Sequence, residues 1–95
     1  MSLEQDHAEI IKWYHEAAHQ GQAETQNSLG LMYAKGWGVQ QDFAEAYKWF
    51  SLSASKGVQK ASKARQILAS QMTPQQIAEG KRRSSIYIVK KRSAA

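Results

Sequence analysis

The chain repeats itself with a period of 36 residues. Residues 5–21, QDHAEIIKWYHEAAHQG, align without a gap on residues 41–57, QDFAEAYKWFSLSASKG, and eight of the seventeen positions are identical. A fixed period of this length is typical of repeat architectures, in which each unit buries its apolar face only against its neighbours. The repeat therefore predicts a stacked array of similar units rather than a fold closed around one central element.

Each copy has the local signals of one helix. Asp6 and Asp42 stand where an N-cap belongs, and a glutamate follows each of them three residues later, as in a capping box. Gly21 and Gly57 stand where the helix should stop, because glycine enters the left-handed conformation without steric cost. We therefore expect one helix in each copy, from the aspartate to the glycine.

Further helices are expected between and after the two copies. Thr25, Ser28, Leu29, Met32 and Tyr33 fall at i, i+3, i+4, i+7 and i+8, which predicts an amphipathic helix over about 22–35 that ends at Lys35-Gly36. Gly30 on this helix indicates a close approach to a neighbouring helix, since glycine otherwise weakens a helix interior.

Two more helices are expected after the second copy. Ala61, Ala64, Ile67, Leu68 and Met72 predict a helix over about 59–72. The segment from Thr73 to Gln76 then reads as a capping box with proline in the first helical position, which starts a last helix. The sequence therefore predicts five antiparallel helices in all.

These residues resemble the Sel-one-like repeat, an α-solenoid family related to the tetratricopeptide repeat. The resemblance lies in residues 23–57 and rests on Leu29-Gly30-x-Met32-Tyr33, Gly36-x-Gly38-Val39, Gln41-Asp42 and Ala46-x-x-Trp49. Residues 64–80 resemble the closing segment of such proteins. The resemblance covers about 5–80 and implies an all-α superhelix, with a C-terminal capping helix and a concave surface for protein partners.

In this frame, residues 1–80 form the repeat domain. One full repeat, about 22–57, is flanked by a half repeat, 4–21, and by a capping pair, 58–80. Residues 81–95 are expected to be a flexible basic tail. Residues 1–72 hold seven basic and seven acidic side chains, whereas residues 73–95 hold six basic and one acidic, so the whole net charge of +5 belongs to this end. Within it, SSIYIV (84–89) has a strand-like composition.

The resemblance also implies where a partner would bind. Mapping the tetratricopeptide helix onto 22–35, and the same offset onto the next helix, places seven residues on the concave side: Glu24, Asn27, Leu31, Lys35, Lys60, Lys63 and Ile67. Leu31 and Ile67 lie off the packing stripe, so we expect them to be exposed, and the lysines favour a partner with carboxylates. Trp37, between two glycines, is either an exposed anchor or folds back on a helix.

An alternative function comes from His15-Glu16-Ala17-Ala18-His19, which matches the H-E-x-x-H pattern of zinc hydrolases. Histidines at i and i+4 of a helix can share one zinc ion, with the glutamate as general base. The repeat argues against it, because the second copy has Ser51 and Ser55 at the histidine positions. No third ligand is apparent, so we expect surface histidines, no metal and no cofactor.

The remaining expectations concern packing, partners and compartment. Trp13 and Trp49 recur in register and are both predicted to lie in the core between helices. The chain has no cysteine and no apolar stretch long enough to span a membrane, and its polar N-terminus is unlike a secretory signal, which favours the cytoplasm. The expected function is a non-enzymatic scaffold that binds a protein or peptide. Self-association and binding of a nucleic acid or anionic surface by the basic tail are alternatives.

Overall fold

The computed structural model describes residues 3–93 of the chain, and side chains from residue 8 onward. Within these residues the chain forms helices and connecting turns and no strand. The helices, in chain order, are α1 (Leu3–His19), α2 (Ala23–Lys35), α3 (Phe43–Ser55), α4 (Gln59–Ala69) and α5 (Pro74–Ser93). The five helices predicted from the sequence are all present, and the all-α fold is confirmed.

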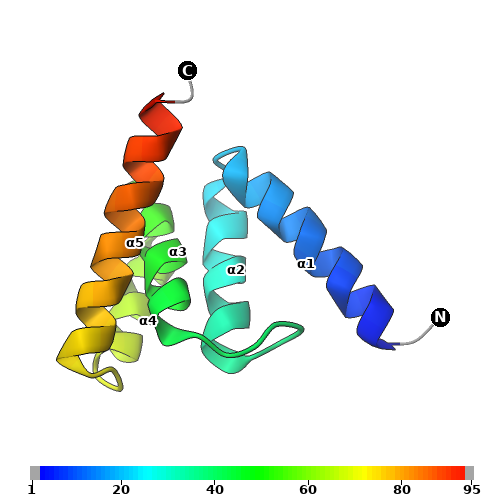
Figure 1. The fold of residues 1–95 in the computed structure, drawn as a ribbon, viewed down its shortest axis with the longest axis horizontal. Coiled ribbons are helices and arrows are strands. Elements are labelled where there is room, and N and C mark those ends of the chain that lie inside the picture. The colour runs from blue at the N-terminus through cyan, green and yellow to red at the C-terminus, as the bar shows by residue number, and fades with distance from the viewer. Residues whose placement is uncertain (1–2, 94–95) are drawn as a thin grey trace.

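The helices stack in the order of the chain, with α3 at the centre. Helix α2 packs between α1 and α3, while α3 also packs against α4 and α5, and α2 touches α4. Figure 1 shows that α1, α3 and α5 run in one direction and that α2 runs back between α1 and α3. It also shows α1 leaning away from α2 toward its N-terminal end. The first helix is thus the least covered of the five.

Several helix ends follow the local signals in the sequence. The Asp42 side chain accepts a hydrogen bond from the backbone N–H of Glu45 at 3.0 Å, as an N-cap does. At the start of α5, Thr73 and Gln76 exchange bonds between side chain and backbone in both directions, which completes the predicted capping box. Gly36 has φ of 71° and closes α2 through its N–H to Met32.

Other ends differ from the prediction. Helix α1 begins at Leu3, so Asp6 lies inside the helix rather than at its cap. Helix α4 ends at Ala69, three residues before Met72. The largest correction concerns residues 81–93, which were expected to form a tail with a strand-like segment and instead continue α5 to Ser93. The reason is tertiary: Gly80, Arg83 and Tyr87 pack on α3, and this packing overrides the β propensity of 84–89.

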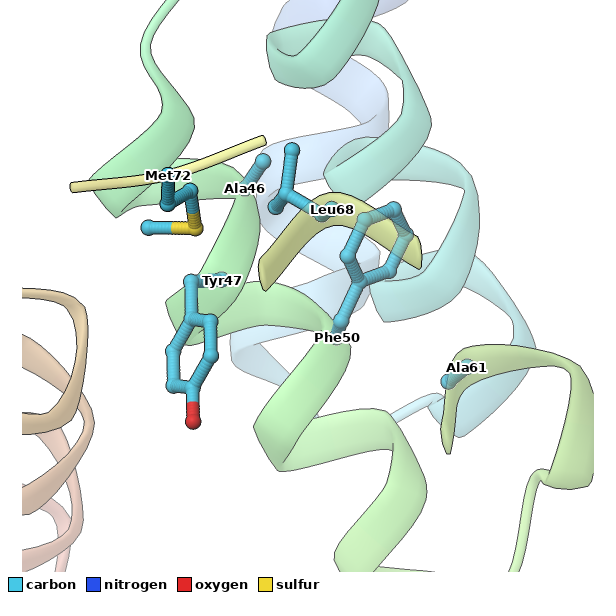
Figure 2. Packing of buried hydrophobic residues seen from close by; sticks show 6 residues of the cluster. All are labelled: Ala46, Tyr47, Phe50, Ala61, Leu68 and Met72. Carbon is cyan, nitrogen blue, oxygen red and sulfur yellow. The ribbon is translucent and has the colours of Figure 1, made fainter. Parts of the chain in front are cut away.

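The main core cluster lies between α3 and α4. Its buried residues are Ala46, Tyr47, Phe50, Ala61, Leu68 and Met72. Figure 2 shows that Ala46, Tyr47 and Phe50 come from α3, and that Leu68 and Met72 approach them from α4 and the turn after it. Helix α2 borders this cluster through the partly buried Leu31 and Ala34. The C-terminal half of the stack is therefore well packed.

Close helix approaches are set by two glycines. A Cβ atom on Gly30 would lie 2.6 Å from the Phe50 ring, and one on Gly80 would lie 2.8 Å from Tyr47. Glycine at these positions lets α2 and α5 lie directly against the aromatic side chains of α3. The predicted role of Gly30 is therefore confirmed.

The second core cluster joins α1, α2 and α3. It consists of Ala18, Leu29, Trp49 and Leu52, with Tyr14, Met32, Tyr33 and Tyr87 around it. Trp49 is 0 % exposed and confirms the prediction of a core residue, whereas Trp13 is 65 % exposed and the prediction for it was wrong. The identical sequence position is buried only where flanking helices cover it on both sides.

Across residues 3–93, no helix combines the length and apolar character that crossing a membrane requires.

Candidate functional site

A shallow hollow separates α2 from α4 on the side predicted to bind a partner. Its volume is about 220 Å³. Three of the seven predicted residues line it: Leu31 and Lys35 from α2, and Ile67 from α4. The remaining lining is mostly apolar and comes from α2, α3, α4 and the turn that follows, through Ala34, Phe43, Phe50, Ala64, Leu68 and Gln71. We call this feature the α2–α4 hollow.

Two of the predicted groove residues have structural roles that the sequence did not reveal. Asn27 is buried, with 8 % of its surface exposed, so it is not available to a partner. Leu31 is only partly exposed and packs against the main core cluster, which contradicts the expectation that it has no internal contact. The reason is the helix phase: the buried side of α2 includes Gln26, Asn27 and Gly30 and is rotated from the predicted stripe.

The other predicted residues are exposed. Ile67 is 64 % exposed and lies beside the apolar lining of the hollow. Glu24, Lys60 and Lys63 are also exposed but do not line the hollow. Since Lys60 and Lys63 precede Ile67 by seven and four residues, all three share one face of α4. The accessible part of the predicted site is therefore an apolar hollow with lysines beside it.

Trp37 is exposed in the turn after α2, with 58 % of its surface accessible. The Lys35 ammonium lies 5.7 Å from the centroid of its ring. The side chain is therefore exposed, while its role as an anchor stays a prediction. Trp37 does not line the α2–α4 hollow; it lines a different one, of about 530 Å³, with Ile10, Ile11, Met32 and the two glycines beside it.

The two histidines of the H-E-x-x-H match face an aromatic cluster. His15 Nε2 is hydrogen-bonded to the Tyr33 hydroxyl at 2.9 Å, and His19 Nδ1 to the Tyr87 hydroxyl at 3.1 Å. Both imidazole rings meet the Trp49 ring edge to face, with centroids 5.8 and 5.6 Å away. The sequence predicted surface histidines; the contact of His19 with Tyr87 was not expected, because Tyr87 belongs to the segment predicted to be a tail.

This environment lowers the pKa of both histidines. Burial lowers the pKa of His15 from 6.5, and the neighbouring His19 lowers it further. The pKa of His19 is lowered as well, first by burial and then by Lys48 and Lys91. Within the described residues, no group of three His, Cys, Asp or Glu side chains could hold a metal ion. The pair therefore joins α1 to α3 and α5, and the alternative of a zinc hydrolase has no ligand set in this part of the chain.

The basic residues of α5 are partly occupied by contacts within the chain. Arg83 forms ion pairs with Asp42 at 3.0 Å and Glu45 at 3.1 Å on α3, and with Glu79 on its own helix. Arg82 pairs with Glu79 at 2.6 Å, and these two arginines hold the Glu79 pKa at about 2. Part of the charge expected to attract an anionic partner thus anchors α5 to α3. Binding of nucleic acid stays a prediction.

A third hollow, of about 420 Å³, lies along α1 and was not anticipated. Its lining is Ile10, Trp13, Tyr14 and Ala17 from α1, with Thr25 from α2. This surface was not predicted because Trp13 was expected to lie in the core, as Trp49 does. Within the described residues no other helix covers this side of α1, so Ile10 and Trp13 are exposed.

Comparison with known proteins gives one positive result. The family model described as Sel1 repeat matches residues 2–22 and 23–58. The first match ends just before α2 begins, and the second ends three residues after α3. No curated protein matches the chain.

Proposed function

The chain belongs to the Sel1 repeat family, and from this membership we propose that it is a scaffold that binds a segment of a partner protein in the α2–α4 hollow. Sel1 repeats are generally protein–protein interaction modules and are generally not enzymes. The proposal concerns which surface does the binding and what kind of segment it accepts.

One observation carries the proposal: the exposure of Ile67 beside an apolar hollow. A large aliphatic side chain that is 64 % exposed contributes little to the core of the chain itself. Within the hollow, Phe43, Phe50 and Leu68 supply an apolar floor. An apolar side chain of a partner that enters this space would remove both its own surface and that of Ile67 from water.

The charges around the hollow indicate the chemistry of the segment. Lys35 lines the hollow, while Lys60 and Lys63 lie exposed on the face of α4 that carries Ile67. Exposed lysines of one sign speed association with an oppositely charged partner and disfavour a basic one. We therefore expect a segment with one apolar anchor and flanking Asp or Glu residues, and we expect its binding to weaken as salt is raised.

The test compares two single substitutions of exposed aliphatic residues. Ile67→Asp places a carboxylate in the hollow, whereas Val89→Asp places one on α5, where Val89 is 61 % exposed. Both variants should unfold at nearly the temperature of the unaltered chain, since surface changes of this kind alter stability by only about 0.5 kcal/mol. Partners recovered by affinity capture and identified by mass spectrometry should be lost with Ile67→Asp and kept with Val89→Asp.

A second variant tests the role of charge separately. Lys63→Glu should weaken capture in low salt and have little effect in high salt, because screening removes the electrostatic contribution of an exposed residue. Equal capture by the unaltered chain and by Ile67→Asp would disprove the hollow as the binding surface. Loss with both Ile67→Asp and Val89→Asp would point to a different or a larger interface.

A further inference from the structure

The hollow along α1 has a buried counterpart in the second copy of the repeat. Its lining residues, shifted by 36 positions, are Ala46, Trp49, Phe50, Ser53 and Ala61. All five are at most 1 % exposed. In the first copy, by contrast, Ile10 is 40 % exposed and Trp13 is 65 % exposed. We call the surface formed by Ile10, Trp13, Tyr14, Ala17 and Thr25 the N-terminal face.

The structure shows what covers this surface in the second copy. Helix α2 lies on it, with Gly30 directly against the Phe50 ring. At the start of α2, the Ser53 hydroxyl donates a hydrogen bond of 2.7 Å to the carbonyl of Ala23. Further along α2, Leu31 and Ala34 pack against the cluster that contains Ala46, Phe50 and Ala61. Helix α2, antiparallel to α3, thus covers the part of this surface around Phe50 and Ser53, while α1 and α5 contact the Trp49 ring.

We propose that the N-terminal face is a docking site for one amphipathic helix of a partner, which lies on α1 as α2 lies on α3. The site is separate from the α2–α4 hollow, and the inference does not depend on the proposed function. It follows from the comparison of two copies of one sequence pattern, of which one is covered and the other is open.

The contact between Gly30 and Phe50 defines the helix that fits. Tyr14 takes the position of Phe50, so the docked helix needs glycine where it crosses this ring. By analogy with Leu31 and Ala34, aliphatic or small residues should follow one and four positions after the small residue. This is the helix-in-groove mode of recognition, in which anchors recur at i, i+3 or i+4 and i+7.

Charge sets the direction of the docked helix. In the second copy, the start of α2 lies over the C-terminal half of α3, as the bond between Ser53 and Ala23 shows. The equivalent end of the N-terminal face carries Glu16 and Glu24, both exposed. These carboxylates favour the positive end of a helix dipole, so a helix antiparallel to α1 should begin there.

The experiment uses the full chain and a probe taken from the chain itself. A helix-stapled peptide with the sequence of residues 22–36 is added to the ¹⁵N-labelled protein, and the indole N–H signals of the three tryptophans are followed by NMR. The Trp13 signal should move in a saturable way, while the Trp49 signal should stay in place. Movement of Trp49 instead would mean that the peptide displaces the chain's own α2, and this would overturn the proposal.

Two controls test specificity. A peptide in which the glycine equivalent to Gly30 is replaced by leucine should bind at least about tenfold more weakly, because its side chain meets the Tyr14 ring. In the protein, Ile10→Lys should abolish the shift of Trp13, while Ala8→Lys, an exposed residue of α1 outside the hollow, should preserve it. Ile10 is already exposed, so neither variant should unfold the chain.

Three results would refute the proposal. The first is no shift of Trp13 at peptide concentrations of about 1 mM, which is where even weak specific binding is observed. The second is equal binding of the glycine and leucine peptides, which would mean that the helix does not cross Tyr14. The third is an unchanged Trp13 shift in Ile10→Lys, which would place the peptide elsewhere.

Discussion

Trp13 and Trp49 occupy the same position in the two copies of the repeat, yet Trp13 is 65 % exposed and Trp49 is 0 % exposed. The residues next to them are also alike, because each tryptophan follows a lysine and lies in a helix with the same pattern. The difference arises outside the copies. Trp49 has α1 on one side, through His15 and His19, and α5 on the other, through Tyr87. The stability of a repeat therefore depends on the helices that pack against it.

A second pair of positions shows the same contrast at the turn between units. Met72 fills the main core cluster beside Tyr47 and Leu68. The residue 36 positions earlier is Gly36, which has no side chain, and the equivalent space is the hollow of about 530 Å³ lined by Ile11 and Met32. Gly36 instead serves the backbone, since its φ of 71° ends α2. At this position the residue of the first copy, Gly36, forms a turn, and that of the second copy, Met72, packs in the core.

The largest loss of stability is expected when the tryptophans are replaced. Trp49→Ala should lower the free energy of unfolding by about 3 to 5 kcal/mol, because it removes a large buried side chain and leaves a cavity. Trp13→Ala should cost no more than about 1 kcal/mol, as most of its surface is already in water. Denaturant unfolding measures both. Equal losses for the two variants would contradict the difference in packing between the copies.

A smaller loss of stability is expected when the methionines near the two turns are replaced. Met72→Ala should cost about 2 to 5 kcal/mol, since it opens in the second copy the space that Gly36 leaves in the first. The comparison in the first copy is Met32→Ala, at a side chain that is half-buried and borders an existing hollow. It should cost clearly less in the same assay. A larger loss for Met32→Ala would show that the first copy is the better packed one.

The smallest expected effect is a pH dependence of stability. It arises from His15 and His19, which only the first copy has. His15 and His19 have pKa values lowered from 6.5, so below that pH the unfolded chain binds more protons than the folded chain. The stability present above about pH 6.5 should therefore be lost progressively as the pH falls toward the folded-state values. The thermal midpoint should be a few degrees lower at about pH 5.5 than at about pH 7.5.

The control removes the titrating groups. The double variant His15→Gln/His19→Gln should show a flatter profile over the same range, since the second copy has serines at these positions. The nearby carboxylates of Asp42 and Glu79 have lowered pKa values and do not titrate in this window. An equal fall of the midpoint in the double variant would assign the pH dependence to another part of the molecule.

Much of the fold could be read from local signals. Asp42, Gly36 and the segment from Thr73 to Gln76 mark helix ends by chemistry that involves only neighbouring residues, and the structure confirms them. Gly30 was recognised as a close contact because a glycine inside a helix needs a steric reason. Of the candidate site, only the accessible residues Lys35 and Ile67, with the half-buried Leu31, came together around the hollow.

The sequence by itself determined the number, the order and most ends of the helices, because caps, turns and periodicity act over a few residues. The tertiary structure decided which copies of one pattern are covered and where the last helix ends. Trp13 stays exposed since burial needs a neighbour on each side. Residues 81–93 are helical because Arg83 and Tyr87 find partners on α1 and α3, at sequence separations of 38 to 68 residues. Such contacts depend on the assembled stack, and no local pattern contains them.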